Sequence, residues 1–189
     1  MKFRLLFLTC LLSGSLMISA RGGEAVLMNE ENPQSLPVLT QIEKPFVFIY
    51  GEWAGKAKVE DGIAKLDPEN GKGGAGTNEN MSASPDQRPI LRITIGKQNK
   101  AKRLSLILRD ASGRSATWHY DLTVLTPEVP TFLRPMGNRP LSQPHSIDKV
   151  NGQPGSLPDL QKLTQWKLGG DSSDDALNAE VSVILLSDE

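Results

Sequence analysis

Apolar and polar residues alternate along three neighbouring segments in the middle of the chain. Every second residue is apolar in residues 91–95, 104–109 and 116–122. A period of two predicts strands with one buried face, and the short spacing predicts an antiparallel meander that is covered on one side. Asp110 and Gly113 occupy the first and fourth positions of a four-residue turn after the second segment, as type I turns prefer.

A two-residue turn signal joins two short segments further upstream. Asp61-Gly62 separates residues 56–60 from residues 63–66, and this dipeptide is typical of a tight β-hairpin. With this loop the apolar residues of the two arms pair on one face, Val59 with Ala64 and Ala57 with Leu66. A consistent apolar face is what a hairpin register requires, so the segment is predicted to fold in this way.

Further strands are predicted on both sides of these segments. Residues 46–50 form a continuous apolar run of aromatic and β-branched residues, which predicts a buried strand. Additional strands are expected at residues 131–134, 164–168 and 181–186. About nine strands without a long amphipathic helix predict an all-β fold, an antiparallel β-sandwich of the jelly-roll type, over residues 45–189.

Three stretches lack a clear strand pattern. Residues 21–44 are polar and irregular, and we expect them to form an N-terminal arm. Residues 67–88 are rich in glycine and proline, and we expect a loop there. The proline-rich segment 127–158 is long for a loop in a compact domain, so we expect Leu141 and Ile147 to return from it to the core.

The first twenty residues have the composition of a secretory signal. Lys2 and Arg4 precede an apolar stretch that ends with the small residue Ala20. We therefore predict a signal peptide over residues 1–20, with cleavage after Ala20 or Ala25. The alternative is an uncleaved anchor, for which the apolar stretch is short and interrupted. The predicted protein is secreted, or periplasmic and part of the cell envelope, without a membrane span after cleavage.

Composition excludes several classes of function. The chain of 189 residues has 21 Lys+Arg against 22 Asp+Glu and a formal net charge of −1, which argues against nucleic-acid binding. Its one cysteine, Cys10, lies in the predicted signal peptide. The mature chain is then cysteine-free, so we expect neither a disulfide framework nor a cysteine-based zinc site nor thiol chemistry.

The sequence contains none of the common catalytic motifs. Residues 71–76 match G-x-G-x-x-G formally, but a dinucleotide site needs a strand before the glycines and a helix after them. We therefore interpret them as part of a mobile loop. Patterns for a nucleophile elbow, a zinc protease or a P-loop do not occur. We predict that the protein is not an enzyme, and keep a secreted hydrolase as a third hypothesis.

Two stretches resemble parts of galactose-binding-like jelly rolls. The first comprises residues 106–113 and 118–122, and the second comprises residues 166–171, which lead into the last strand. This class includes many carbohydrate-binding modules of secreted bacterial proteins. The resemblance covers roughly residues 45–187 and implies two antiparallel sheets, often with a concave face that holds sugar. Many members of the class instead serve as structural or protein-contact modules.

The polar face of the predicted meander is the candidate binding site. Its planar donors and acceptors can hydrogen-bond sugar hydroxyls or carboxylates. The residues expected on this face are Arg92, Thr94, Ser105, Arg109, Thr117, His119 and Asp121. Trp53 stands in a loop-like context and is the candidate aromatic platform, whereas Trp118, Tyr120 and Trp166 are expected in the core. The alternative is a plain solvated sheet face with cross-strand Arg–Asp pairs.

Two other features receive a structural interpretation. His145 lies in the proline-rich segment and is expected to be solvated. Three acidic residues, Asp171, Asp174 and Asp175, resemble part of a calcium loop, but Ala176 stands where an EF-hand needs glycine. We expect a solvated turn there and no cofactor, with structural calcium as the alternative.

The predicted function is therefore binding without catalysis. We expect an exported, non-catalytic module that binds carbohydrate through the polar sheet face. The alternative is a structural or protein–protein interaction module of the cell envelope that has no small ligand. The expected partner is a carbohydrate or another envelope protein, and not nucleic acid.

Overall fold

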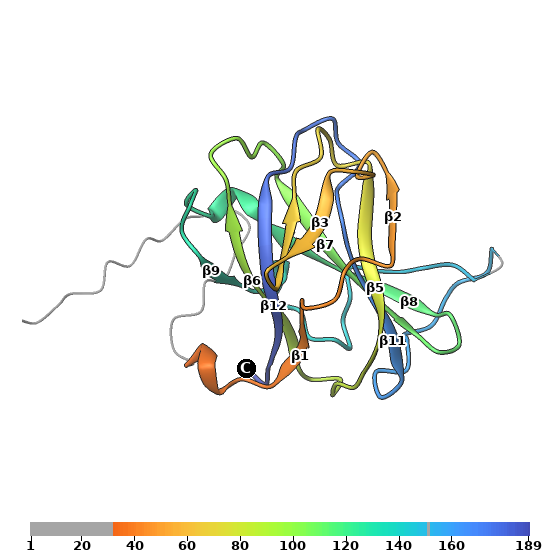
Figure 1. Ribbon diagram of the computed structural model, residues 1–189. Helices are drawn as coiled ribbons and strands as arrows, with labels where there is room; N and C mark the ends of the chain where they lie inside the picture. Colours follow the sequence, from red (N-terminus) through yellow and green to blue (C-terminus); the bar gives the residue numbers. More distant parts are fainter. Residues whose placement is uncertain (1–31, 151) are drawn as a thin grey trace, which may run out of the picture.

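Two six-stranded sheets pack face to face around the apolar core (Figure 1). The computed structural model describes residues 32–150 and 152–189, so the predicted signal peptide lies outside the described residues. All strand pairs among the described residues are antiparallel. The antiparallel β-sandwich predicted from the alternating pattern is confirmed, with twelve strands rather than about nine.

Sheet A is built around the last strand of the chain. Its strands are, in spatial order, β3 (Ala57–Glu60), β4 (Ile63–Leu66), β12 (Ala179–Ser187), β6 (Arg88–Ile95) and β9 (Thr131–Leu133). The short strand β1 (Val38–Gln41) also pairs with β12. The last strand therefore hydrogen-bonds to three other strands of this sheet.

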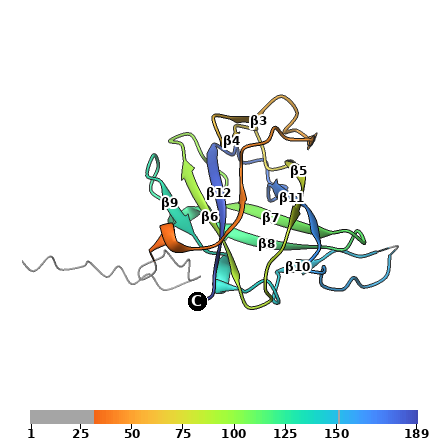
Figure 2. The same ribbon diagram turned by 60° about the horizontal axis from the view of Figure 1, so that its bottom comes forward.

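Sheet B contains the remaining strands. In spatial order they are β10 (Ser146–Ile147), β8 (Ser115–Asp121), β7 (Arg103–Asp110), β11 (Leu163–Gly169), β5 (Gly73–Met81) and β2 (Phe48–Gly51). Figure 2 shows β7 and β8 side by side, with β10 next to β8 at the edge of the sheet.

The described helices are single 3₁₀ turns. They are η1 (Pro33–Ser35), η2 (Leu122–Val124) and η3 (Met136–Asn138). Among the described residues no helix is long and apolar enough to cross a membrane.

The alternating apolar residues of sheet B face the core as predicted. Trp118, Tyr120 and Trp166 are almost completely buried. Their polar atoms find partners at the periphery of the core, because a buried donor without a partner is costly. Trp118 Nε1 donates to the carbonyl of Pro140 at 3.2 Å, and Tyr120 Oη donates to the carbonyl of Pro89 at 2.8 Å.

The predicted hairpin is confirmed in its register. Strands β3 and β4 pair Ala57 with Leu66, Lys58 with Lys65, and Val59 with Ala64. Asp61 and Gly62 have φ angles of 52° and 75°, the positive values that a two-residue hairpin turn of type I′ requires.

The predicted three-stranded meander is wrong in one respect. Strands β7 and β8 form the expected hairpin in sheet B, but β6 belongs to sheet A. The chain crosses from one sheet to the other between Ile95 and Arg103. An alternating pattern indicates which side of a strand is buried. Strands of both sheets of a sandwich bury one side against the same core, so the pattern does not indicate to which sheet a strand belongs.

The predicted loop 67–88 contains a strand of sheet B. Strand β5 lies between β11 and β2, and its glycines occur where neighbouring side chains need space. A Cβ atom at Gly74 would lie 2.7 Å from Tyr50 Oη, and one at Gly76 would lie 2.6 Å from Lys167 Cβ. The G-x-G-x-x-G match therefore runs into a strand, and the interpretation as a mobile loop is wrong.

Three smaller predictions also need correction. The N-terminal arm predicted over residues 21–44 contains the strand β1. The strand predicted as buried over residues 46–50 corresponds to the edge strand β2, and Val47 beside it is 63% exposed. In the proline-rich segment, Leu141 is buried as predicted, but Ile147 is exposed on β10. An apolar run indicates a strand without indicating whether another strand covers it.

Candidate ligand-binding face

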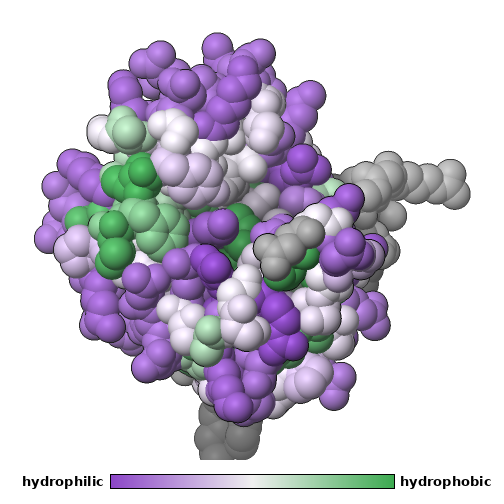
Figure 3. Space-filling view, turned by 90° about the vertical axis from the view of Figure 1, so that its right-hand side faces the viewer, coloured by the Kyte–Doolittle hydropathy of each residue, from purple (hydrophilic) through white to green (hydrophobic). Residues whose placement is uncertain are grey.

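The candidate site is the outer face of sheet B, which points away from the core. Its side chains alternate with the buried ones and form three rows across the strands. The row from Tyr50 runs through Gly74, Gly169 and Ser105 to His119. The row from Phe48 runs through Gly76, Lys167 and Ile107 to Thr117, and the third row contains Asn78, Gln165, Arg109 and Ser115. Figure 3 views this side of the molecule and shows apolar patches within a largely hydrophilic surface.

Tyr50 is the exposed aromatic residue of this face. The residue is 44% exposed, and its hydroxyl lies over Gly74. Lys167 Nζ is 5.7 Å from the ring centroid, within the range of a cation–π contact. Burial raises the pKa of the Tyr50 phenol, and the Asp148 carboxylate raises this pKa further. Tyr50 and the segment after β10 therefore border the same face.

The sequence prediction assigned the aromatic platform to the wrong residue. Trp53 is completely buried, and its ring lies against Gly73, 2.8 Å from the position that a Cβ would occupy there. A ring without exposed surface cannot stack on a sugar. The sequence did not indicate Tyr50 because the apolar run around it predicted a buried strand. The signal that could have indicated it is the group of glycines in β5, which pair with β2 and make room for the ring.

Arg92 and Thr94 do not join the other candidates. Both lie on β6 in sheet A, where Arg92 Nη1 donates to Ser182 Oγ at 3.2 Å. Thr94 lines a separate groove of about 440 Å³, together with Lys58, Lys65 and residues at the start of β12. The predicted polar face is therefore divided between the two sheets.

The structure brings Arg109, Thr117 and His119 together on sheet B, but with different exposure. Arg109 is exposed beside a hollow of about 300 Å³ that Thr164, Gln165 and the β7–β8 turn also line. Thr117 pairs with Ser146 of β10 and is nearly buried. The open part of the face thus lies over β7, β11, β5 and β2.

Asp121 has a local structural role. Its Oδ1 atom accepts hydrogen bonds from the backbone N–H of Thr123 at 2.9 Å and from Thr123 Oγ1 at 2.6 Å. These contacts cap the 3₁₀ turn η2 after β8. Asp121, which the sequence suggested as a ligand contact, therefore caps the first residues of η2 instead.

His119 and His145 pack against each other beside β8. Their ring centroids are 4.8 Å apart, and Ser105 Oγ lies 2.9 Å from His119 Nδ1. The backbone N–H of His119 donates to His145 Nδ1 at 3.1 Å, so this nitrogen is unprotonated and its lone pair accepts the hydrogen bond. Burial lowers the pKa of both rings, for His119 to about 4 with a further contribution from Arg103. His145 is thus half-buried and bonded, contrary to the solvated position expected for it.

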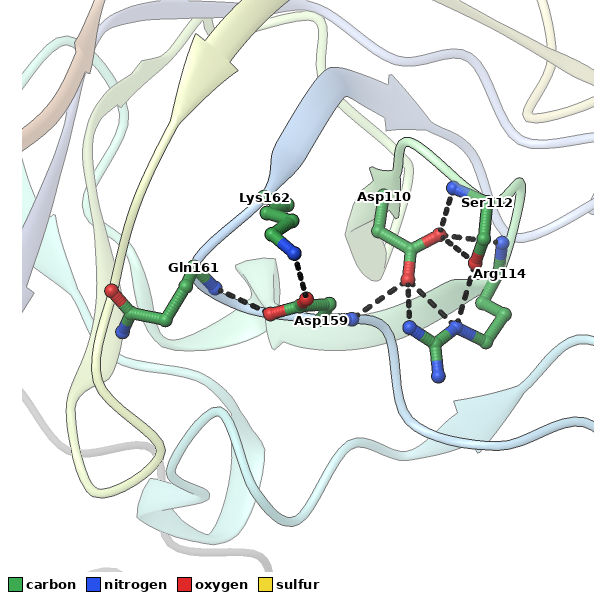
Figure 4. Close-up of polar contacts among 6 residues, drawn as sticks. All are labelled: Asp110, Ser112, Arg114, Asp159, Gln161 and Lys162. Atoms are coloured by element: carbon green, nitrogen blue, oxygen red, sulfur yellow. Dashed lines mark hydrogen bonds and ion pairs between the residues drawn. The ribbon is translucent and has the colours of Figure 1, made fainter.

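Asp110 holds one rim of the face in place (Figure 4). Its Oδ1 atom accepts from Ser112 N–H, Ser112 Oγ and Arg114 N–H, and its Oδ2 atom accepts from Arg114 and from Asp159 N–H at 2.8 Å. Burial opposes ionisation, but these hydrogen bonds outweigh it and keep the pKa of Asp110 well below its usual range. The carboxylate therefore joins the β7–β8 turn to the segment that leads into β11.

Two of the three acidic residues that resemble a calcium loop, Asp171 and Asp174, form contacts within the protein. Asp174 forms an ion pair with Lys72, and Asp171 Oδ1 accepts from Ser173 N–H at 3.1 Å. In residues 32–150 and 152–189, no group of three His, Cys, Asp or Glu side chains is placed to hold a metal ion. The calcium alternative gains no support from this arrangement.

Comparison with known proteins gives no independent indication of function. No protein-family model matches the chain, and no curated protein sequence matches it. The proposals below therefore depend on the geometry and chemistry of the outer face of sheet B.

Proposed function

We propose that the protein is an exported, non-catalytic carbohydrate-binding module whose ligand lies on the outer face of sheet B. The observation that carries the proposal is an exposed aromatic ring on the same face as a row of planar polar side chains. Tyr50 supplies the ring, and Asn78, Gln165 and Arg109 supply the row.

This combination suits the two sides of a sugar. The C–H-rich face of a sugar ring packs on an aromatic ring, and its hydroxyls exchange hydrogen bonds with amides and guanidinium groups. Gln165 Nε2 already donates to Asn78 Oδ1 at 2.9 Å, which orients both amides on the sheet. Their remaining donors and acceptors are available to a ligand.

Glycines make room for Tyr50 and Lys167 on this face. Gly74 and Gly169 stand in the same cross-strand row as Tyr50, and Gly76 stands in the next row. The Tyr50 ring and the Lys167 side chain fill the space above Gly74 and Gly76, so a sugar would contact these two side chains and not the sheet backbone.

The serine and histidine of this face do not suit a hydrolase. Ser105 is only 4% exposed, so its hydroxyl is not accessible to a polymeric substrate. A nucleophilic serine must reach the substrate while its histidine acts as the base. This geometry favours binding over the hydrolase hypothesis.

Carbohydrate binding can be tested on the chain purified in its exported form. A polysaccharide array should identify a ligand, and Tyr50→Ala should weaken its binding by at least about tenfold, because the ring contact is lost. Phe132→Ala, at a half-buried aromatic residue on β9 of sheet A, is the matched control and should leave binding unchanged. Absence of binding to any polysaccharide, or equal binding by Tyr50→Ala and the unaltered chain, would contradict the proposal.

A second candidate function is protein contact at the edge of sheet B. Strand β2 ends the sheet, and Val47 beside it is 63% exposed. An exposed apolar edge can take up a strand of another protein. Val47→Lys would impair such a contact, whereas it should leave binding of carbohydrate over Tyr50 and Lys167 intact.

A further inference from the structure

Two cations on the outer face of sheet B have no acidic partner among the described residues. Ion pairs elsewhere in the described chain involve Lys56, Lys58, Lys65, Lys72, Lys97, Arg114 and Lys162. Lys167 instead lies near the Tyr50 ring, and the Arg109 guanidinium lies near Gly113 of the β7–β8 turn. Both cations of this face are therefore without a direct ion pair among the described residues, although the formal net charge of the protein is −1.

The two cations are close enough to act on one ligand. Lys167 pairs with Ile107, and Gln165 pairs with Arg109, so Lys167 and Arg109 are diagonal neighbours on adjacent strands. The Cα atoms of such diagonal neighbours are about 7–8 Å apart. The Lys167 ammonium lies towards Tyr50 and the Arg109 guanidinium lies towards the β7–β8 turn, so the two charges flank Gln165 and both long side chains would turn inward to hold one group. An acidic group above Gln165 could contact both of them.

The other charged groups of this face lie on its β8 side. Asp148 Oδ2 accepts from Ser115 Oγ at 2.5 Å, and Asp121 caps η2. Arg103 and the neutral histidines belong to the same side. The Asp148 carboxylate also raises the pKa of Tyr50, so it lies within electrostatic range of this ring. Lys167 and Arg109 against this one carboxylate leave the part of the face between Tyr50 and Arg109 with a net positive charge.

We propose that the site selects acidic glycans, with a carboxylate or sulfate group held between Lys167 and Arg109 and a sugar ring on Tyr50. This inference rests on the proposed carbohydrate binding and adds the chemical class of the ligand. Arg109 can bind such a group through two parallel N–H donors, and Lys167 adds a point charge.

The inference is tested by calorimetry with matched pairs of polysaccharides. One pair is a uronic-acid polymer and its carboxyl-reduced form, and the other is a sulfated polymer and its desulfated form. We expect the acidic member of at least one pair to bind more tightly, and its advantage to decrease at high salt. Loss of binding on carboxyl reduction identifies the carboxylate as the recognised group, and loss on desulfation identifies the sulfate.

Substitutions then assign the effect to the two cations. Lys167→Gln and Arg109→Gln should each weaken binding of the acidic polymer by about tenfold, as expected for one charge-assisted contact. Lys100→Gln removes an exposed cation from the β6–β7 connection and should change nothing. The unfolding temperature of each variant verifies that it is folded.

The outcomes separate this inference from the proposed function. Equal binding of acidic and neutral members, or an acidic preference that survives both substitutions, would overturn the inference while carbohydrate binding stands. Absence of binding to all four polymers and to the wider array would overturn the proposed function itself.

Discussion

Asp110 illustrates at the scale of a single residue how a carboxylate can organise a binding surface. The residue is 2% exposed and accepts hydrogen bonds from Ser112, Arg114 and Asp159. Two of these donors belong to the β7–β8 turn and the third belongs to the segment before β11. The rim beside Arg109 and Gln165 is therefore held together by a buried carboxylate.

Asp110→Asn should destabilise the protein. The amide keeps one acceptor but loses the charge and leaves donors of Arg114 and Asp159 without a good partner, at a cost of about 3 kcal/mol in the free energy of unfolding. Urea unfolding measures the change, with the exposed Asp86→Asn as the control. Similar unfolding midpoints for the two variants would contradict this role.

The histidine pair predicts a loss of stability in mild acid. The pKa of His119 is about 4 in the folded chain, below its ordinary value of 6.5, and that of His145 is lowered as well. The unfolded chain therefore binds protons more strongly between these values, so stability decreases as the pH falls from about 6.5 towards 4. Above this window both states are neutral at these rings and no dependence is expected.

Substitution of both histidines tests this pH dependence. Asn at position 145 retains an acceptor for the His119 backbone N–H but does not titrate, and Gln at position 119 likewise removes a titrating ring. We expect the unfolding temperature of the His119→Gln, His145→Asn double variant to change less between pH 6.5 and about 4 than that of the unaltered chain. Parallel curves for the two proteins would show that other groups cause the dependence.

At the scale of the element, β5 shows that a glycine-rich segment can be an interior strand. It pairs with β11 on one side and with β2 on the other. The side chains that its glycines lack are replaced by Tyr50 and Lys167 from those neighbours. The strand thereby joins the edge strand to the sheet and lets the Tyr50 ring and the Lys167 side chain lie close over the sheet.

Gly76→Val should disrupt this strand in spite of the high β-propensity of valine. Its Cβ would lie 2.6 Å from Lys167 Cβ and would also meet the Trp166 carbonyl, so backbone as well as side chain must move. Such overpacking costs about 1–3 kcal/mol in the free energy of unfolding. Asn80→Val, at another exposed position of the same strand, should change it by less than about 0.5 kcal/mol. Chemical denaturation of both variants measures the difference, and equal effects would argue against close packing at Gly76.

At the scale of the whole molecule, the sandwich decides which polar residues can act together. The chain leaves sheet A after β6 and enters sheet B at β7, so Arg92 and Arg109 belong to different sheets. The segment after β9 returns to cover β8 with β10, which removes Thr117 from the surface. The site that remains contains Arg109 from the predicted set and adds Tyr50, Lys167, Gln165 and Asn78.

The sequence by itself determined the features that depend on neighbouring residues. The alternation in 104–109 and 116–122 predicted two strands and their buried faces, and Asp61-Gly62 predicted a hairpin together with its register. Trp118, Tyr120 and Trp166 were correctly assigned to the core. These features follow from steric and hydrophobic patterns over a few residues. Such patterns do not depend on where the strand lies in the fold.

Only the tertiary structure decided which strands are neighbours and what covers each of them. The same alternation suits either sheet of a sandwich, so it could not show that β6 and β7 belong to different sheets. The burial of Trp53 depends on Gly73, and the room for Tyr50 depends on Gly74, which are contacts between segments on different strands or turns. The aromatic group of the proposed site was therefore decided by packing over long sequence distances, which no local pattern records.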